Sequence, residues 1–147
     1  MKVWGLFPFN FFPFRIHNVR VKKESDLWKL LKKNTPQIKW TRLESWSSFG
    51  VCDCLGYHDL CGFFMVELKL IKNPKQKKVL FSPHQKLFHL TRPKRNFILL
   101  GVASPRTIKL YESKDIMGLF EDHNATQCVA KDDWDLITRV LINTRPS

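Results

Sequence analysis

Two acidic residues and one lysine are spaced in this chain as a metal-assisted hydrolytic site requires. Asp53 closes the segment 50–53, and Glu67 and Lys69 follow fourteen and sixteen residues later. Residues two apart on a β-strand point to the same face, so Glu67 and Lys69 should emerge together. A hairpin between the two segments would fold Asp53 back beside them. Two converging carboxylates repel each other unless a cation lies between them.

The chemistry that fits this arrangement is hydrolysis of a phosphate ester. Oxygen ligands favour Mg²⁺ or Mn²⁺, and the backbone carbonyl of Leu68 is available as a further ligand. The metal would polarise a phosphodiester while the Lys69 ammonium positions or deprotonates a water molecule. Two simpler interpretations remain open: Asp53 could be a turn acid, and Glu67 and Lys69 could belong to an exposed strand ladder.

The first half of the chain contains the elements that must position these residues. Leu27, Leu30 and Leu31 recur at helical spacing and predict a helix over residues 23–33. Alternation of apolar and polar residues predicts a strand over 38–44. Two further strands, over 51–57 and 62–71, should form a hairpin with a short turn around 58–61.

The second half begins with a well-marked helix. Ser82 suits the N-cap, Pro83 the first helical position and Gln85 the third, so a helix should run to about Leu90. Strands over 96–103 and 107–111 and a final helix over 133–143 complete the pattern. The predicted order is αβββαββα, which indicates an α/β domain with a mixed sheet flanked by helices.

With these elements in place, residues 24–102 resemble the PD-(D/E)xK nuclease superfamily, which has the restriction-endonuclease-like fold. That family has an acid closing the second strand and a (D/E)-x-K motif in the third. The segment 50–53 matches its G-x-P-D motif, except that Cys52 stands where proline is usual, and Glu67, Leu68 and Lys69 match fully. Within the superfamily, the chain is most similar to the VRR-NUC and Holliday-junction-resolvase-like branch common in phages.

The resemblance implies further site residues. Gln85 matches a Gln-bearing motif at the start of the following helix, although it could equally complete a capping box with Ser82. A helical acid completes the site in the family, and Glu24 is the candidate, with Glu44 as its rival. Ser25 or Asp26 could instead cap the first helix. The candidate catalytic set is therefore Asp53, Glu67, Lys69, Gln85, Glu24 and Glu44, with Asp53, Glu67 and the Leu68 carbonyl as metal ligands.

The charge of the chain points to a polyanionic partner. Its 147 residues contain 25 Lys and Arg against 13 Asp and Glu, a net charge of +12. Between Leu68 and Tyr111 there are eleven basic residues and no acid. A solvated basic face is the simpler interpretation of such a run. The candidate nucleic-acid-binding residues are Lys72, Lys75, Lys77, Lys78, His84, Lys86, Arg92, Lys94 and Arg95.

Length and composition favour one domain. We expect an aromatic N-terminal arm (1–20), a nuclease core (21–111) and an acidic C-terminal region with the terminal helix (112–147). Three cysteines and His58 spell C-x-C-x3-H-x2-C between residues 52 and 61, which suggests zinc only superficially, because C-x-C on a strand points both thiols to one face. The chain has no apolar run of 18 residues and a poor signal sequence, so we expect no membrane association. Reduced thiols and a cytoplasmic, non-secreted protein are expected (the host cytoplasm if phage-encoded).

The resemblance, together with the candidate metal site and the basic charge, implies a Mg²⁺- or Mn²⁺-dependent DNA endonuclease. Its partner would be DNA, double-stranded or branched, and a structure-selective activity on branched DNA or Holliday junctions would fit a homodimer. The alternative is a non-catalytic, basic nucleic-acid-binding module with a degenerate nuclease fold.

Overall fold

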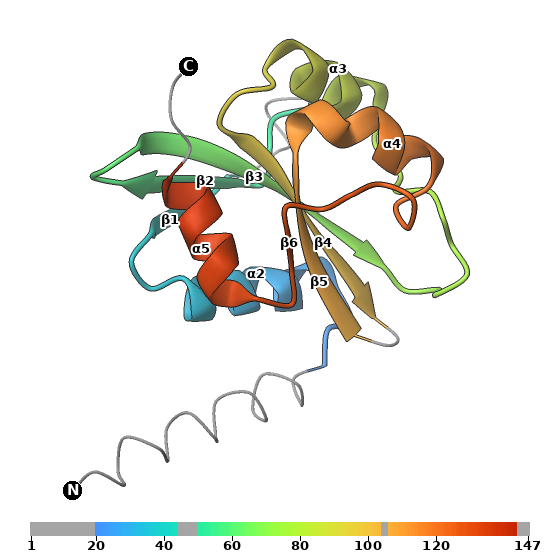
Figure 1. The fold of residues 1–147 in the computed structure, drawn as a ribbon, viewed down its shortest axis with the longest axis horizontal. Helices are drawn as coiled ribbons and strands as arrows, with labels where there is room; N and C mark the ends of the chain where they lie inside the picture. Colours follow the sequence, from blue (N-terminus) through green and yellow to red (C-terminus); the bar gives the residue numbers. More distant parts are fainter. Residues whose placement is uncertain (1–19, 44–49, 104–105, 144–147) are drawn as a thin grey trace, which may run out of the picture.

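A computed structural model of the chain describes residues 20–43, 50–103 and 106–143. Its centre is a six-stranded sheet in the order β1-β2-β3-β4-β5-β6. Helices lie on both sides of this sheet (Figure 1). The strands are β1 (Lys39–Arg42), β2 (Cys54–His58), β3 (Gly62–Ile71), β4 (Asn96–Ala103), β5 (Arg106–Glu112) and β6 (Ala130–Lys131). The helices are α2 (Glu24–Asn34), α3 (Pro83–Thr91), the 3-10 helix η2 (Ser113–Asp115), α4 (Ile116–Glu121) and α5 (Trp134–Ile142).

The sheet is mixed, as predicted. β1, β2 and β3 form an antiparallel meander. β4 pairs with β3 in parallel, and the chain reaches it through α3, because parallel neighbours need a crossover connection. β5 and β6 then add to the sheet in antiparallel orientation. The observed order follows the predicted αβββαββ as far as β5; η2, α4 and β6, which were not predicted, come before α5.

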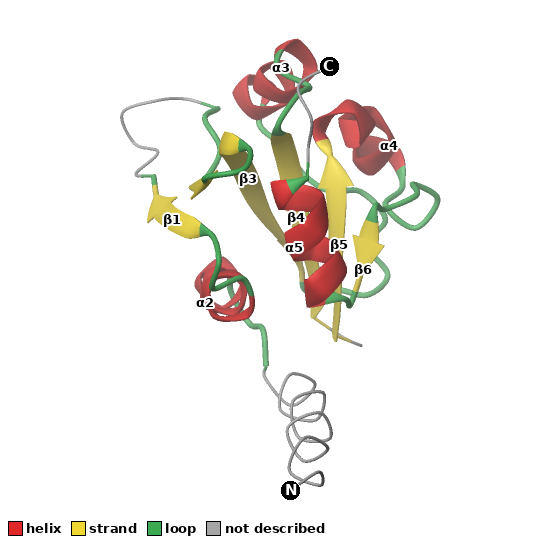
Figure 2. Cartoon of the chain, turned by 60° about the vertical axis from the view of Figure 1, so that its left-hand side comes forward, coloured by secondary structure: helices red, strands yellow, loops and turns green. Residues whose placement is uncertain are grey.

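The protein has two apolar cores, one on each side of the sheet and each covered by helices. In both views, α2 and α5 lie on one side of the sheet and α3 and α4 on the other (Figures 1 and 2). Alternate residues of β3 serve the two sides: Phe64, Val66 and Leu68 join the core beneath α2 and α5, whereas Ile71 joins the core beneath α4. Glu67 and Lys69 therefore face the α3 side, which confirms the predicted alternation along this strand.

The loop before β2 differs from the prediction. The strand predicted over 51–57 begins only at Cys54; before it, Gly50 has φ 81° and lies against the first turn of α3. A Cβ atom on Gly50 would lie 2.5 Å from the carbonyl oxygen of His84. The expectation that Cys52 and Cys54 share a face is wrong, since Cys54 packs in the α2-side core and Cys52 faces α3.

The N-terminus of the first helix is capped by Asp26, one of the two capping residues that the sequence left open. The Asp26 carboxylate accepts hydrogen bonds from the backbone N–H groups of Lys22 and Lys23, at 2.9 and 3.1 Å. These backbone donors lower the pKa of Asp26. Capping thus falls to Asp26, and the Glu24 side chain is left to act elsewhere. In the described parts of the chain, no helix has the length and apolar character needed to cross a membrane.

Candidate active site

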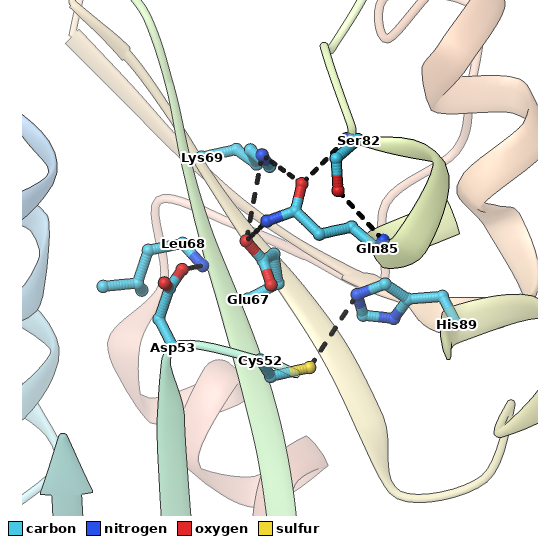
Figure 3. Close-up of polar contacts among 8 residues, drawn as sticks. All are labelled: Cys52, Asp53, Glu67, Leu68, Lys69, Ser82, Gln85 and His89. Atoms are coloured by element: carbon cyan, nitrogen blue, oxygen red, sulfur yellow. Dashed lines mark hydrogen bonds and ion pairs between the residues drawn. The ribbon is translucent and has the colours of Figure 1, made fainter. Parts of the chain in front are cut away.

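Asp53 lies immediately before β2 and reaches across the hairpin to β3. Its Oδ2 accepts a hydrogen bond from the backbone N–H of Leu68, at 2.9 Å (Figure 3). This bond holds the Asp53 carboxylate against the β3 backbone at Leu68, the residue that follows Glu67. The hairpin therefore brings Asp53 to the (D/E)-x-K segment, as the sequence predicted. Leu68 contributes its N–H here, and the role of its carbonyl as a metal ligand stays a prediction.

Glu67 is a buried acid whose charge is poorly accommodated. Its side chain is 1% exposed. Oε2 accepts a hydrogen bond from Gln85 Nε2 at 2.8 Å and lies 3.8 Å from Lys69 Nζ. Burial, and then the negative charge of Asp53, raise the pKa of Glu67 to about 9, while Lys69 acts in the opposite direction. Without a cation the carboxyl therefore holds its proton more tightly than an exposed glutamate does, and a divalent ion could take the place of that proton.

Gln85 connects the helix cap with the acidic cluster. Its backbone N–H donates to Ser82 Oγ, and its Oε1 accepts from the Ser82 backbone N–H, so the predicted capping box is present. The same Oε1 accepts a hydrogen bond from Lys69 Nζ at 3.0 Å. Both interpretations of Gln85 therefore hold at once: it caps α3 and it holds Glu67 and Lys69 in place.

Lys69 has an apolar support as well. Its ammonium lies 4.9 Å from the centre of the Phe81 ring, a cation–π contact, and its side chain is 16% exposed. A lysine held on three sides in this way has few alternative rotamers. Its ammonium is thereby positioned next to Glu67, one of the two acids that could hold a metal ion.

Of the two candidates for the further acid of the site, Glu24 and Glu44, the structure describes only Glu24. Glu24, the first residue of α2, is exposed, yet partial desolvation raises its pKa, and the next largest cause is the charge of Asp53. Lys69 and Arg42 act in the opposite direction. Glu24 thus belongs to the same electrostatic neighbourhood as the cluster. Its rival Glu44 lies outside the described residues.

Most of the predicted DNA-contacting residues are on the surface. The exposed ones are Lys72, Lys75, Lys77, Lys78, His84, Arg92 and Lys94, whereas Lys86 and Arg95 are half-buried. The lysines that follow β3 belong to a segment that bonds to the α4 region, where His123 N donates to Lys77 O and Val79 N donates to Leu119 O. The 92–95 group follows the C-terminal end of α3, where Arg95 O accepts from Met65 N. Two of the basic groups rest on aromatic rings: Lys86 on Phe120 and Arg92 on Phe88.

Sequence reasoning missed one feature of this region. Cys52 and His89 lie behind Glu67, with Sγ 3.8 Å from Nε2 (Figure 3). Among the described residues, the group suited to holding a metal is Cys52, Glu67 and His89, rather than the C-x-C-x3-H-x2-C pattern. In that pattern Cys61 instead contacts the carbonyl of Leu141. Only the packing of α3 brings together residues 37 positions apart, and no spacing in the sequence indicates it.

No family model matches the chain, and no curated protein and no solved structure matches it either. Fold and site together define its class: a mixed α/β protein with an Asp–Glu–Lys–Gln cluster, half-buried around a buried Glu67, on one face of its sheet.

Proposed function

We propose that this chain is a Mg²⁺- or Mn²⁺-dependent endonuclease that hydrolyses phosphodiester bonds in DNA. The observation that carries the proposal is the meeting of Asp53 and Glu67 beside Lys69, with Gln85 bridging the last two. The position of Asp53 directly before the second strand, and of Glu67 and Lys69 on the third, supports a restriction-endonuclease-like arrangement. A buried carboxyl with a raised pKa beside a second acid is what a cation-binding site requires.

The chain's own residues divide the work. Asp53 and Glu67 would hold the ion, with the Leu68 carbonyl as a third ligand, and Glu24 would complete the outer shell. The bound ion supplies charge that polarises the phosphodiester and stabilises the developing negative charge. Lys69 orients the attacking water and assists loss of its proton, and Gln85 fixes the Lys69 ammonium. In-line attack would leave 5′-phosphate and 3′-hydroxyl ends.

The basic surface would supply affinity for the substrate. Lys72, Lys75, Lys77 and Lys78 are exposed and follow directly on the strand that carries Glu67 and Lys69. Contacts to phosphates position a duplex without reading its sequence. A branched substrate such as a Holliday junction would need two such sites, and hence a homodimer.

The central experiment is a cleavage assay on supercoiled plasmid, a four-way junction and a flap, with Mg²⁺ or with EDTA. We expect nicking only with the metal, and none from Asp53→Asn, which keeps the shape of the side chain but loses its charge. Calorimetry should show that the wild type binds Mn²⁺. The Mn²⁺ affinity of Asp53→Asn should be lower by about 10-fold or more.

Two results would contradict the proposal. Equal nicking by wild type and Asp53→Asn would trace the activity to a contaminant. Salt-sensitive DNA binding without cleavage of any substrate, and without Mn²⁺ binding, would instead favour the non-catalytic nucleic-acid-binding module.

The dual role of Gln85 gives a second prediction, with a matched control. Gln85→Ala and Ser82→Ala both remove the capping box, so each should lower the free energy of unfolding by about 1 kcal/mol in urea denaturation. Only Gln85→Ala also removes the contacts to Glu67 and Lys69. We expect cleavage to fall by about 10-fold or more in Gln85→Ala and to stay close to wild type in Ser82→Ala. Equal cleavage by the two variants would reduce Gln85 to a capping residue.

A further inference from the structure

A second group of metal-ligating side chains lies on the inner side of Glu67. Cys52 and His89 are 0% exposed and Glu67 is 1% exposed. One donor atom from each lies within 4.8 Å of the other two, and Cys52 Sγ and His89 Nε2 are 3.8 Å apart. Cys52 comes from the loop before β2, Glu67 from β3 and His89 from α3, so three separate elements converge on one point.

One oxygen of Glu67 has no partner. Oε2 takes the contacts with Gln85 and Lys69, whereas Oε1 is buried and has no hydrogen-bond partner within the described residues. In Figure 3 the carboxylate oxygen without a dashed line points toward Cys52 and His89. A buried oxygen left unpaired is costly, and native proteins seldom keep one without a ligand or an ion to satisfy it.

The imidazole of His89 is oriented toward the same point. Its Nδ1 lies within hydrogen-bond distance of Ser113 Oγ, at the start of η2. In the tautomer that donates Nδ1–H to this hydroxyl, Nε2 presents its lone pair to Cys52 and Glu67. Metal-bound histidines are typically held in this way by a second hydrogen bond through the other ring nitrogen.

We propose that Cys52 Sγ, Glu67 Oε1 and His89 Nε2 form a Zn²⁺ site, buried behind the Asp53–Glu67 cluster. A set of one thiolate, one carboxylate and one imidazole suits Zn²⁺, whereas Mg²⁺ is bound by oxygen alone. On binding, the thiol and the carboxyl are deprotonated, and their two negative charges balance the ion in a buried environment. Three protein ligands leave the fourth position of a tetrahedral site to water.

The site has a consequence for activity that rests on the proposed nuclease function. Glu67 is the residue common to both groups, so a soft ion bound on its inner side would draw the carboxylate away from Asp53. Zn²⁺ would then inhibit Mg²⁺-dependent cleavage. The Zn²⁺ site itself stands or falls without any measurement of cleavage.

The test is metal binding by the full-length protein. We expect one equivalent of Zn²⁺ by elemental analysis after dialysis, and a thiolate-to-metal absorption band when Co²⁺ is the probe. Cys52→Ser and His89→Asn should each lower Zn²⁺ affinity by about 100-fold or more and abolish the Co²⁺ band. Ser113→Ala, a milder change, should weaken binding by about 10-fold through loss of imidazole orientation.

Controls come from the rival cysteine pattern. Cys61→Ser and His58→Ala should bind Zn²⁺ as the wild type does, because neither side chain belongs to the cluster. Circular dichroism confirms that each variant is folded; should Cys52→Ser fail to fold, Ser113→Ala carries the comparison. Failure of the wild type to bind Zn²⁺, or undiminished binding by Cys52→Ser or Ser113→Ala, would overturn the site. Zn²⁺ binding without any nuclease activity would overturn only the proposed function.

Discussion

We expect Lys69→Met to lower the rate of Mg²⁺-dependent DNA cleavage by about 1,000-fold while leaving DNA affinity nearly unchanged. Methionine keeps an unbranched apolar stem over Phe81 but removes the ammonium that contacts Gln85 Oε1 at 3.0 Å and lies 3.8 Å from Glu67. Positioned proton-transfer groups contribute about 10²- to 10⁴-fold to enzymatic rates. The loss should therefore appear in the chemical step.

Single-turnover cleavage measures that step, and fluorescence anisotropy with Ca²⁺ in place of Mg²⁺ measures DNA affinity. Lys131→Ala is the matched control. It also removes one positive charge, but from an exposed position on β6, three strands away from β3, which carries Lys69. A cleavage rate for Lys69→Met within a few-fold of that for Lys131→Ala would exclude Lys69 from the reaction.

Glu67→Gln should increase the stability of the metal-free protein while abolishing cleavage. The raised pKa of Glu67, about 9, means that the folded protein retains a proton that the unfolded chain releases above the ordinary pKa of 4.5. Between these two values stability falls as pH rises, because the unfolded state binds fewer protons than the folded state. Glutamine is uncharged at every pH, so the variant escapes this loss.

Urea denaturation in EDTA at two pH values tests this. At pH 8, Glu67→Gln should exceed the wild type by about 1 to 3 kcal/mol, and at pH 4.5 the difference should largely vanish. The buried His89, whose pKa is lowered to about 4 by burial and by Lys69, titrates in both proteins and contributes little to the comparison. Glu121→Gln, at an exposed position, should change stability little at either pH. A stability difference independent of pH would contradict the assigned cause.

Local periodicity accounts for what the sequence predicted well. Alternation along residues 62–71 was enough to place Glu67 and Lys69 on one face, and a short turn was enough to bring Asp53 beside them. The Ser82 and Gln85 pair was recognised because capping depends on residues three apart. Each of these relations is contained within one element or one hairpin.

The features that escaped prediction depend on distant or very short segments. Cys52 meets His89 only because the crossover after β3 lays α3 across the loop before β2. α4 has six residues and β6 has two, too few for a hydrophobic period to emerge. Their positions are set by packing on the sheet, to which β6 adds an edge strand beside β5.

The close approach of Gly50 to α3 bears on which ion the proposed nuclease would accept. A Cβ at this position would collide with the His84 carbonyl, so loop and helix are packed backbone against backbone. The loop contacts α3 on one side, and on the other Asp53 Oδ2 accepts from the Leu68 backbone N–H at 2.9 Å, so Asp53 is held in one position beside Glu67. Mg²⁺ demands ligands at about 2.1 Å in near-ideal octahedral geometry, whereas Ca²⁺ needs longer bonds and an adaptable site. Selection by ionic radius would thus originate in a residue that has no side chain.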